Sequence, residues 1–378
     1  MPFKYGGTVS SNSFTNRTKE LNKLVNNLTS GINTIIISPR RWGKSSLVEK
    51  AMRRVKTKNK NHKVVMIDLF SVSSINEFLE VYTREVVRAS SSKWEEWLTV
   101  GKDFFKQVIP KFSFQADPTS DFGVSFDWEE SEKYADEILD LPERIAKKKK
   151  VKFIICLDEF QYLSDLDGYK KFEKKMRAVW QRQKNVSYCL YGSKRHLMHQ
   201  MFNTSRKPFY RFGDIMFLQK IETKEWIKYI KAKFRQSSKE ITEVAAGLIP
   251  NLMRNHSWYV QQLSHYLWES VDKKATVKDV ATALHRLIET NTPLYIMGAE
   301  NLSNTQLNLL KAIAQGEKQL TSKRVMAQYD IGTPQNVVKN KRTLEKKDII
   351  LKNEDGYELA DPTFAIWFLK VYFNENVI

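Results

Sequence analysis

Short apolar runs alternate with longer amphipathic stretches along the first part of the chain. The apolar runs lie at residues 35–37, 64–69, 153–157, 186–191 and 215–218. Continuous apolar runs of this length are typical of strands that are buried on both faces of a parallel sheet. Helical periodicity occupies the stretches between the runs, at residues 18–28, 75–108, 130–147 and 168–183. This alternation predicts an α/β fold.

One segment departs from this alternation. Residues 111–115 and 123–127 have alternating apolar and polar positions, and Asp117-Pro118-Thr119-Ser120 lies between them. Two period-2 segments joined by turn-forming residues predict a β-hairpin, inserted ahead of the helix at 130–147.

The C-terminal part has a different pattern. Residues 221–290 read as helix throughout, and Thr290-Asn291-Thr292-Pro293 predicts a break. Three helical stretches and two short strands then follow, at residues 303–315, 321–328, 333–347, 349–352 and 356–359. Three helices and a small hairpin indicate a winged helix-turn-helix. The pattern therefore divides the chain into an α/β core (1–220), a helical segment (221–292) and a winged helix domain (293–378).

A phosphate-binding loop follows the first apolar run. Ser38-Pro39-Arg40-Arg41-Trp42-Gly43-Lys44-Ser45 matches G-x-x-x-x-G-K-[ST] except at Ser38, and a helix begins with Ser46-Leu47. Backbone N–H groups at such a helix start bind phosphate, Lys44 reaches the β- and γ-phosphates, and Ser45 can ligate Mg²⁺. Because glycine is the permissive residue for a tight turn, we expect Ser38 to adopt an ordinary backbone conformation. The residues that bind the nucleotide are then Arg40, Arg41, Trp42, Gly43, Lys44, Ser45 and Ser46.

Two carboxylates end the run at 153–157. Strand ends of this kind meet at the carboxyl edge of a parallel sheet, where ligands bind. Asp158 is the predicted Mg²⁺ partner, and Glu159 is the predicted general base that activates water. The order of the two motifs along the chain predicts an ATP site with water as the nucleophile.

Further catalytic candidates follow the run at 186–191. Ser193 could sense the γ-phosphate or hold the attacking water, and the alternative is a plain Gly-Ser turn. Arg206 and Arg211 could offset transition-state charge, within the chain or across a subunit boundary of an oligomer. Surface salt bridges are the alternative role for these arginines.

The distribution of charge along the chain indicates where a partner such as DNA could bind. Residues 1–220 hold +15 of the formal net charge of +19, whereas residues 301–378 hold +2. The third predicted helix of the winged helix domain is still locally basic, with Lys339, Arg342 and Lys346 on one face. The densest basic region lies in the core, at Lys147–Lys150 and then Lys170, Lys171, Lys174, Lys175, Arg177, Arg182 and Lys184. DNA or a protein could bind either surface, and solvated helix faces are the alternative.

The amino-acid composition limits the classes of protein to which the chain could belong. The chain is 42% hydrophobic, but it has no apolar stretch near 18 residues and no signal-peptide pattern. We therefore expect a soluble, cytoplasmic protein that does not enter a membrane. Cys156 and Cys189 both fall in apolar runs, which predicts free thiols in the sheet core.

Taken together, these motifs resemble the archaeal-type P-loop ATPases, relatives of the origin-recognition AAA+ proteins and the STAND ATPases. The motifs include Phe14–Leu21, Leu157-Asp158-Glu159-Phe160-Gln161, Tyr191-Gly192-Ser193, Pro208-Phe209-Tyr210-Arg211 and Gly356–Phe368. The resemblance implies an ASCE-type core, a helical lid, a winged helix, and ATP with Mg²⁺ as ligands. It also implies that Arg17 lies near the adenine and that Arg211 is catalytic, although Tyr210 replaces the usual glycine.

Two functions fit these observations. The first is a Mg²⁺-dependent ATPase that acts as a molecular switch or small motor, with turnover moving the lid and the winged helix. The second is a nucleotide-gated regulator that binds DNA or a protein and has negligible turnover.

Overall fold

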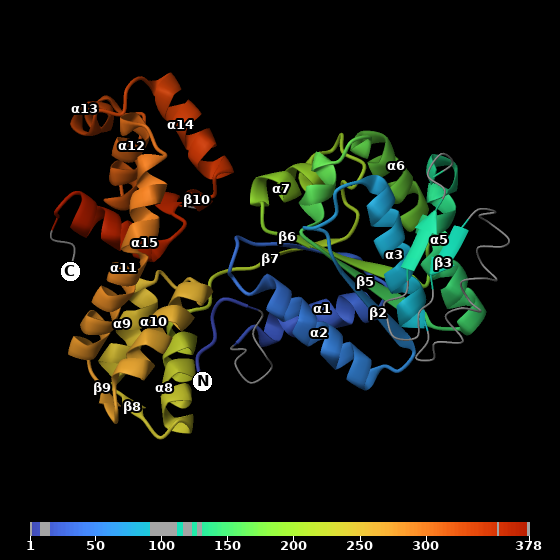
Figure 1. Ribbon diagram of the computed structural model, residues 1–378, viewed down its shortest axis with the longest axis horizontal. Helices are drawn as coiled ribbons and strands as arrows, with labels where there is room; N and C mark the ends of the chain where they lie inside the picture. The colour runs from blue at the N-terminus through green and yellow to red at the C-terminus, as the bar shows by residue number, and fades with distance from the viewer. Residues whose placement is uncertain are drawn as a thin grey trace. The chain divides into compact units, whose positions relative to one another are not determined.

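The computed structural model describes residues 2–7, 16–90, 112–115, 123–126, 131–353 and 355–375 (Figure 1). The chain forms two compact units. One comprises Ser10–Gln219, and the other combines Met1–Val9 with Lys220–Ile378. No helix in the described ranges is both long enough and apolar enough to cross a membrane.

The first unit is built on a five-stranded sheet. Its spatial order is β2 (His62–Asp68), β5 (Lys152–Asp158), β6 (Val186–Gly192), β1 (Thr34–Ile37) and β7 (Asp214–Phe217), and all neighbouring pairs are parallel. The five apolar runs therefore form the predicted parallel sheet. Cys156 and Cys189 are register partners on β5 and β6, and both are buried free thiols, as predicted.

Helices cover both faces of this sheet. Helices α1 (Thr18–Thr29) and α2 (Lys44–Lys58) pack on one face, against alternate strand residues such as Ile36 and Ile154. The other face, with Ile35 and Ile155, packs against helices on the opposite side (Figure 1). These are α3 (Ile75–Ser90), α5 (Ser131–Lys149), α6 (Tyr169–Trp180) and α7 (Arg195–Asn203). The result is a three-layer α/β core.

The predicted hairpin is also present. Strands β3 (Phe112–Gln115) and β4 (Gly123–Phe126) are antiparallel, with Phe112 opposite Phe126. The predicted helix at 75–108 is confirmed as far as Ser90 by α3, and its remainder, residues 91–108, lies outside the described residues. Phe14 and Thr15 of the first family motif also lie outside them.

The second unit begins with a helical region. It contains α8 (Thr223–Gln236), α9 (Glu243–Leu252), α10 (Ser257–Ser270) and α11 (Val277–Glu300). The prediction of helix throughout missed two short parallel strands, β8 (Glu240–Ile241) and β9 (Lys274–Ala275). Each has only two residues, which is too short to leave a period-2 pattern.

The predicted helix break at residues 290–293 is wrong, because α11 continues through Pro293. Side chains of the residues before the proline reinforce the helix. Thr290 Oγ1 donates to the carbonyl of Arg286 at 2.8 Å, and Thr292 Oγ1 donates to that of Ile288 at 2.8 Å. Pro293 is exposed, and so is Glu289, the residue four positions earlier whose carbonyl loses its usual N–H partner.

The winged helix is present as predicted. Its helices are α12 (Asn304–Ala314), α13 (Lys323–Tyr329) and α14 (Pro334–Lys346), and its wing is the antiparallel pair β10 (Ile350–Asn353) and β11 (Gly356–Leu359). Thr333 caps α14, with its side chain accepting a hydrogen bond from Asn336 N, and Pro334 occupies the first turn. Helix α15 (Pro362–Trp367) and a π-helical turn (Phe368–Tyr372) follow the wing.

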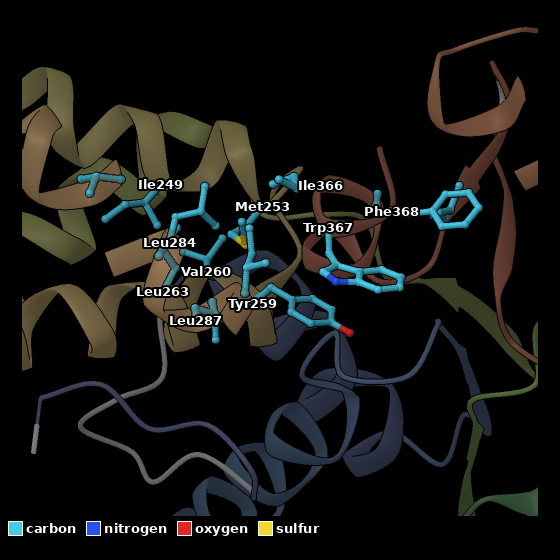
Figure 2. Close-up of a cluster of buried hydrophobic side chains, with 14 of the residues drawn as sticks. Ile249, Met253, Tyr259, Val260, Leu263, Leu284, Leu287, Ile366, Trp367 and Phe368 are labelled. Carbon is cyan, nitrogen blue, oxygen red and sulfur yellow. The ribbon is translucent and has the colours of Figure 1, made fainter. Parts of the chain in front are cut away.

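One hydrophobic cluster joins the helical region to the winged helix. Figure 2 shows Ile249 of α9, Val260 and Leu263 of α10, Leu287 of α11 and Trp367 of α15 within it. All five side chains are buried. Residues on both sides of position 292 therefore share one core, and the predicted division into 1–220, 221–292 and 293–378 stays a prediction.

Candidate nucleotide-binding site

The loop between β1 and α2 has the backbone of a phosphate-binding turn. Arg41 and Gly43 have positive φ angles, of 64° and 87°, whereas Ser38 does not. Ser38 is buried, and its Oγ donates to the carbonyl of Pro39 at 3.1 Å. Ser38 therefore has an ordinary conformation, as expected. Gly43 is the position that needs glycine. A Cβ there would have open space around it, so the requirement comes from its positive φ angle and not from crowding.

Helix α2 supplies the anion-binding groups of the loop. The helix begins at Lys44, and its first regular turn closes with Leu47 N donating to the carbonyl of Gly43 at 3.0 Å. The N–H groups of Lys44, Ser45 and Ser46 precede that bond, so they have no acceptor within the helix. Together with the helix dipole, they form a site that favours phosphate oxygens.

The acidic pair of β5 contacts the start of α2. Ser45 Oγ donates to Asp158 Oδ2 at 2.8 Å, although the two residues are 113 positions apart. Lys44 Nζ lies 2.9 Å from Glu159 Oε1 and 3.4 Å from Asp158 Oδ1. The parallel sheet produces these contacts because the carboxyl ends of β1 and β5 lie at the same edge, with β6 between them.

Glu159 is held by donors on each of its oxygens. While Lys44 binds Oε1, Oε2 accepts hydrogen bonds from Gln161 Nε2 at 2.5 Å and from Ser193 Oγ at 2.8 Å. Ser193 N also donates to Oε2, at 3.1 Å. Glu159 has a φ of 52°, an uncommon conformation for a residue with a long side chain. The site thus fixes both the backbone and the carboxylate of Glu159.

The two carboxylates have opposite pKa shifts. Burial would raise the pKa of Glu159, but Lys44 and the hydrogen bonds from Gln161 and Ser193 outweigh it and bring the pKa below its usual range. Burial dominates at Asp158 and raises its pKa, despite the opposing effects of Lys44 and Ser45. Glu159 is therefore the more readily ionised member of the pair.

Gln161 and Gly192 are site residues whose roles sequence reasoning missed. The Gln161 side chain is fully buried against the end of β6. A Cβ at position 192 would lie 1.9 Å from Gln161 Oε1 and 2.9 Å from Met198 Sδ. Gly192 thus makes room for the glutamine that holds Glu159. The available signal was Gln161 itself, an amide side chain two residues after the predicted base.

Arg17, which precedes α1, forms a hydrogen bond with the phosphate-binding loop. Its side chain is buried, and one terminal nitrogen, Nη2, donates to the carbonyls of Trp42 and Gln219, at 3.0 Å each. Nη1 lies 3.3 Å from Glu20 Oε1. Burial lowers the pKa of Arg17. Arg17 therefore ties the phosphate-binding loop to the segment after β7, and its expected position near the adenine stays a prediction.

The remaining predicted residues divide into two groups. Arg40 and Arg41 are exposed, and Trp42 and Ser46 are buried at the loop. Arg40 reaches the end of β6, with Nε 3.4 Å from Ser193 Oγ and Nη2 3.2 Å from the Tyr162 hydroxyl. These residues all lie around the site, together with Lys44, Ser45, Asp158, Glu159 and Ser193.

Arg211 lies elsewhere. It precedes β7, whose first residue, Asp214, donates its N–H to the carbonyl of Asn33 at 2.9 Å. Asn33 immediately precedes β1, so this is the amino edge of the sheet, opposite the phosphate-binding loop. The structure does not bring Arg211 to Lys44 of the same chain, and its guanidinium lies over the Tyr210 ring at 5.2 Å.

A parallel sheet that carries a phosphate-binding loop on one strand and an acidic pair on another defines the class of P-loop ATPases. Within this class, the chain belongs to the family described as "ATPase domain predominantly from Archaea", which matches residues 14–243. Residues 293–370 match a family described as a probable winged helix domain.

Solved structures of archaeal proteins have a similar fold. The Walker-type ATPase PABY2304 of Pyrococcus abyssi has 18% sequence identity and a TM-score of 0.69, over 98% of this chain and 100% of that chain. The ORC2 protein of Aeropyrum pernix, in its ADPNP–ADP complexes, has 14% identity and a TM-score of 0.58, over 98% of each chain. Its ADP form has 13% identity and a TM-score of 0.53, over 99% of this chain and 96% of that chain. No curated protein matches the chain significantly in sequence.

Proposed function

We propose that this protein binds ATP with Mg²⁺, hydrolyses it with water as the nucleophile, and acts as a molecular switch or small motor. The observation that carries the proposal is the convergence of Lys44, Ser45, Asp158 and Glu159 at the start of α2. The Aeropyrum pernix ORC2 protein of similar fold was solved with ADPNP and ADP, which supports an adenine nucleotide as the ligand.

The residues present fit a Mg²⁺-nucleotide. Ser45 Oγ and Asp158 Oδ2, within 2.8 Å of each other, are a hydroxyl and a carboxylate oxygen, the ligand types that Mg²⁺ prefers. When bound, the ion neutralises charge on the phosphate oxygens. Lys44 and the first N–H groups of α2 would hold those phosphates, and Ser46 and the loop residues Arg40 to Gly43 would complete the binding site.

Glu159 is the proposed general base. Its lowered pKa keeps it ionised near neutral pH, so it can accept a proton from water. Ser193 and Gln161 hold one carboxylate oxygen and thereby orient the other. Arg211 could offset transition-state charge only at a neighbouring subunit of an oligomer, because it lies at the opposite edge of its own sheet. In the proposed switch, turnover moves the lid and the winged helix.

A second function has its own support. Both oxygens of Glu159 already have protein donors, Lys44 on one and Gln161 and Ser193 on the other, so each would have to give up a donor before it could act on water. This favours a nucleotide-gated regulator with negligible turnover, whose partner is DNA or a protein. The candidate partner surfaces are the exposed side chains of Lys339, Arg342 and Lys346 on α14 and the basic residues of the core.

Nucleotide binding and steady-state phosphate release distinguish the two functions. We expect Lys44→Ala to lose ATP binding, and Glu159→Gln to bind ATP but hydrolyse it about 10²–10⁴-fold more slowly. Matched controls on α2 are Lys56→Ala and Glu49→Gln, whose side chains lie away from the phosphate-binding end of that helix.

Each outcome of this experiment has a clear meaning. Normal turnover by Glu159→Gln would show that another group is the base. A wild-type rate as low as that of Glu159→Gln, with and without duplex DNA, would favour the regulator. Retention of ATP binding by Lys44→Ala would refute the site itself.

A further inference from the structure

Three helix-to-strand connections lie side by side at the amino edge of the core sheet. They lead from α2 into β2, from α5 into β5, and from α6 into β6, which are neighbouring strands. Lys152 N donates to the carbonyl of Asn61 at 2.9 Å, and Phe153 N donates to that of Asn185 at 2.8 Å. These bonds join the three connections into one continuous surface. The nucleotide site lies at the other end of the same strands.

This surface is strongly basic. We define the basic edge as the exposed cationic residues on these connections and the adjoining helix ends: Lys56, Lys58, Lys60, Lys147, Lys148, Lys150, Lys152, Arg182 and Lys184. The sequence places them in three separate segments, and only the parallel sheet brings them together. A single charged run is usually a solvated helix face, whereas a surface assembled from three elements concentrates charge of one sign.

The carboxylates at this edge neutralise only part of its charge. Asp140 is ion-paired with Arg144 at 3.3 Å and attracts Lys147 and Arg182. Glu143 is buried, and its Oε2 accepts hydrogen bonds from the backbone N–H groups of Lys184 and Asn185, at 3.1 and 2.8 Å. Its other oxygen lies 3.3 Å from Lys147 Nζ. Within the described part of the chain, several members of the basic edge form no salt bridge: Lys56, Lys58, Lys60, Lys150, Lys152, Arg182 and Lys184. Their mutual repulsion makes a polyanion the favoured partner.

The surface also distinguishes between polyanions. Single-stranded nucleic acids bind through aromatic side chains on which bases stack, and membrane surfaces bind through apolar side chains as well as charge. The exposed large hydrophobic residues of the described chain include Phe70 and Phe217, which lie at the carboxyl ends of β2 and β7, and none belongs to the three connections. A basic surface whose three connections carry no exposed aromatic side chain suits the regular backbone of a duplex, although Ile32, at the amino end of the neighbouring strand β1, is exposed.

We propose that the basic edge binds the phosphate backbone of double-stranded nucleic acid. This inference shares with the proposed function only the choice of DNA as the partner. It requires neither ATP binding nor ATP hydrolysis. Strands of seven residues, such as β2 and β5, separate the basic edge from the phosphate-binding loop by roughly 20 Å. A duplex at the amino edge therefore leaves the nucleotide site accessible.

The test is binding of the full chain to a short duplex DNA, measured by fluorescence anisotropy between about 50 and 200 mM salt. The test variant is Lys150→Ala/Lys152→Ala/Lys184→Ala. The matched control is Lys339→Ala/Arg342→Ala/Lys346→Ala, which removes the same charge from the winged helix. All six side chains are exposed, so we expect both variants to keep the wild-type melting temperature.

The expected result is a smaller salt dependence for the basic-edge variant. The slope of log affinity against log salt falls by about 0.9 for each phosphate that the protein no longer neutralises, so by up to about 2.7 for three lysines. The control variant should keep more of the wild-type slope and affinity. An unchanged slope in the basic-edge variant, or a weakening confined to the control variant, would overturn the proposal.

Binding experiments with other polyanions show whether the basic edge prefers duplex nucleic acid. Duplex RNA that binds like duplex DNA supports the proposal, because both offer a regular backbone. Preference for single-stranded DNA, binding to phosphatidylserine vesicles without binding to duplex, or no binding at low salt would each refute it. Lys44→Ala should bind duplex normally, so a failure of the ATPase assignment and a failure of this proposal give different results.

Discussion

Replacing Gly192 with alanine would put a methyl group where the carboxamide of Gln161 lies. The new Cβ would be 1.9 Å from Gln161 Oε1, far inside van der Waals contact. If Gln161 stays, the crowding costs about 1–3 kcal/mol. If Gln161 moves, its hydrogen bond to the charged Glu159 is broken, which costs about 1.5–3 kcal/mol. Either route lowers the melting temperature by roughly 2–12 °C for a unit of this size.

The assay is thermal unfolding of the full chain, with Gly247→Ala as the matched control. A Cβ at Gly247, within α9, would lie 3.5 Å from Ile227 Cδ1, an ordinary contact. We therefore expect the control to be neutral or slightly stabilised, since alanine restricts the unfolded chain more than glycine does. A Gly192→Ala variant that melts within a degree of the control would contradict the geometry.

A double-mutant cycle then identifies the clashing partner. Gln161→Ala removes the carboxamide, and the nearest remaining atom to the new methyl group at position 192 would then be Met198 Sδ, near the end of a flexible side chain, at 2.9 Å. The double variant Gly192→Ala/Gln161→Ala should be more stable than the sum of the two single effects predicts. Strict additivity would refute the argument that Gly192 exists to accommodate Gln161.

Two other predictions concern pH and the long helix of the second unit. Donors hold the pKa of Glu159 below its ordinary value of 4.5 in the nucleotide-free protein, so the acid limb of kcat/KM for phosphate release, which reports the free protein, should lie below pH 4.5. Gln161→Leu removes one donor and should move this acid limb to higher pH, whereas a purely structural role would leave the limb in place. Pro293→Ala restores a backbone N–H within α11 and should stabilise the protein by up to about 3 kcal/mol in thermal unfolding; no gain would show that the helix is strained for another reason.

Much of the nucleotide site was predictable because its residues directly follow buried strands. Lys44 and Ser45 come after the run at Ile35–Ile37, and Asp158 and Glu159 end the run that forms β5. A parallel sheet necessarily brings such strand ends together, so the contact between Ser45 and Asp158 follows from the fold class alone. The winged helix was predictable for a similar reason, since caps such as Thr333 are local signals.

The features that were not predictable depend on contacts between distant segments. Pro293 is a strong local signal for a helix end, yet Leu287, Ile288 and Ala299 on both sides of it are buried in one cluster, so packing keeps α11 continuous. The location of Arg211 depends on β7 being parallel to β1, which sends the residues before β7 to the amino edge. The position of Gln161, two residues after Glu159, marks it as a candidate, but its contacts with Glu159 and Gly192 depend on β6 lying beside β5.

In the proposed mechanism, the contacts of Lys44 connect nucleotide binding to activation of Glu159 as the base. Lys44 is buried and divides its charge between Glu159 Oε1 and Asp158 Oδ1, at 2.9 and 3.4 Å. Phosphate oxygens at the start of α2 would compete for this amine and draw it away from Glu159. Oε2 would still be held by Gln161 and Ser193, so Oε1 alone would become available to accept a proton. On the proposed function the two oxygens would then have different roles, with Oε2 positioning the carboxylate and Oε1 acting as the base. In this arrangement the substrate itself releases the base, which limits proton transfer to the time when phosphate is bound.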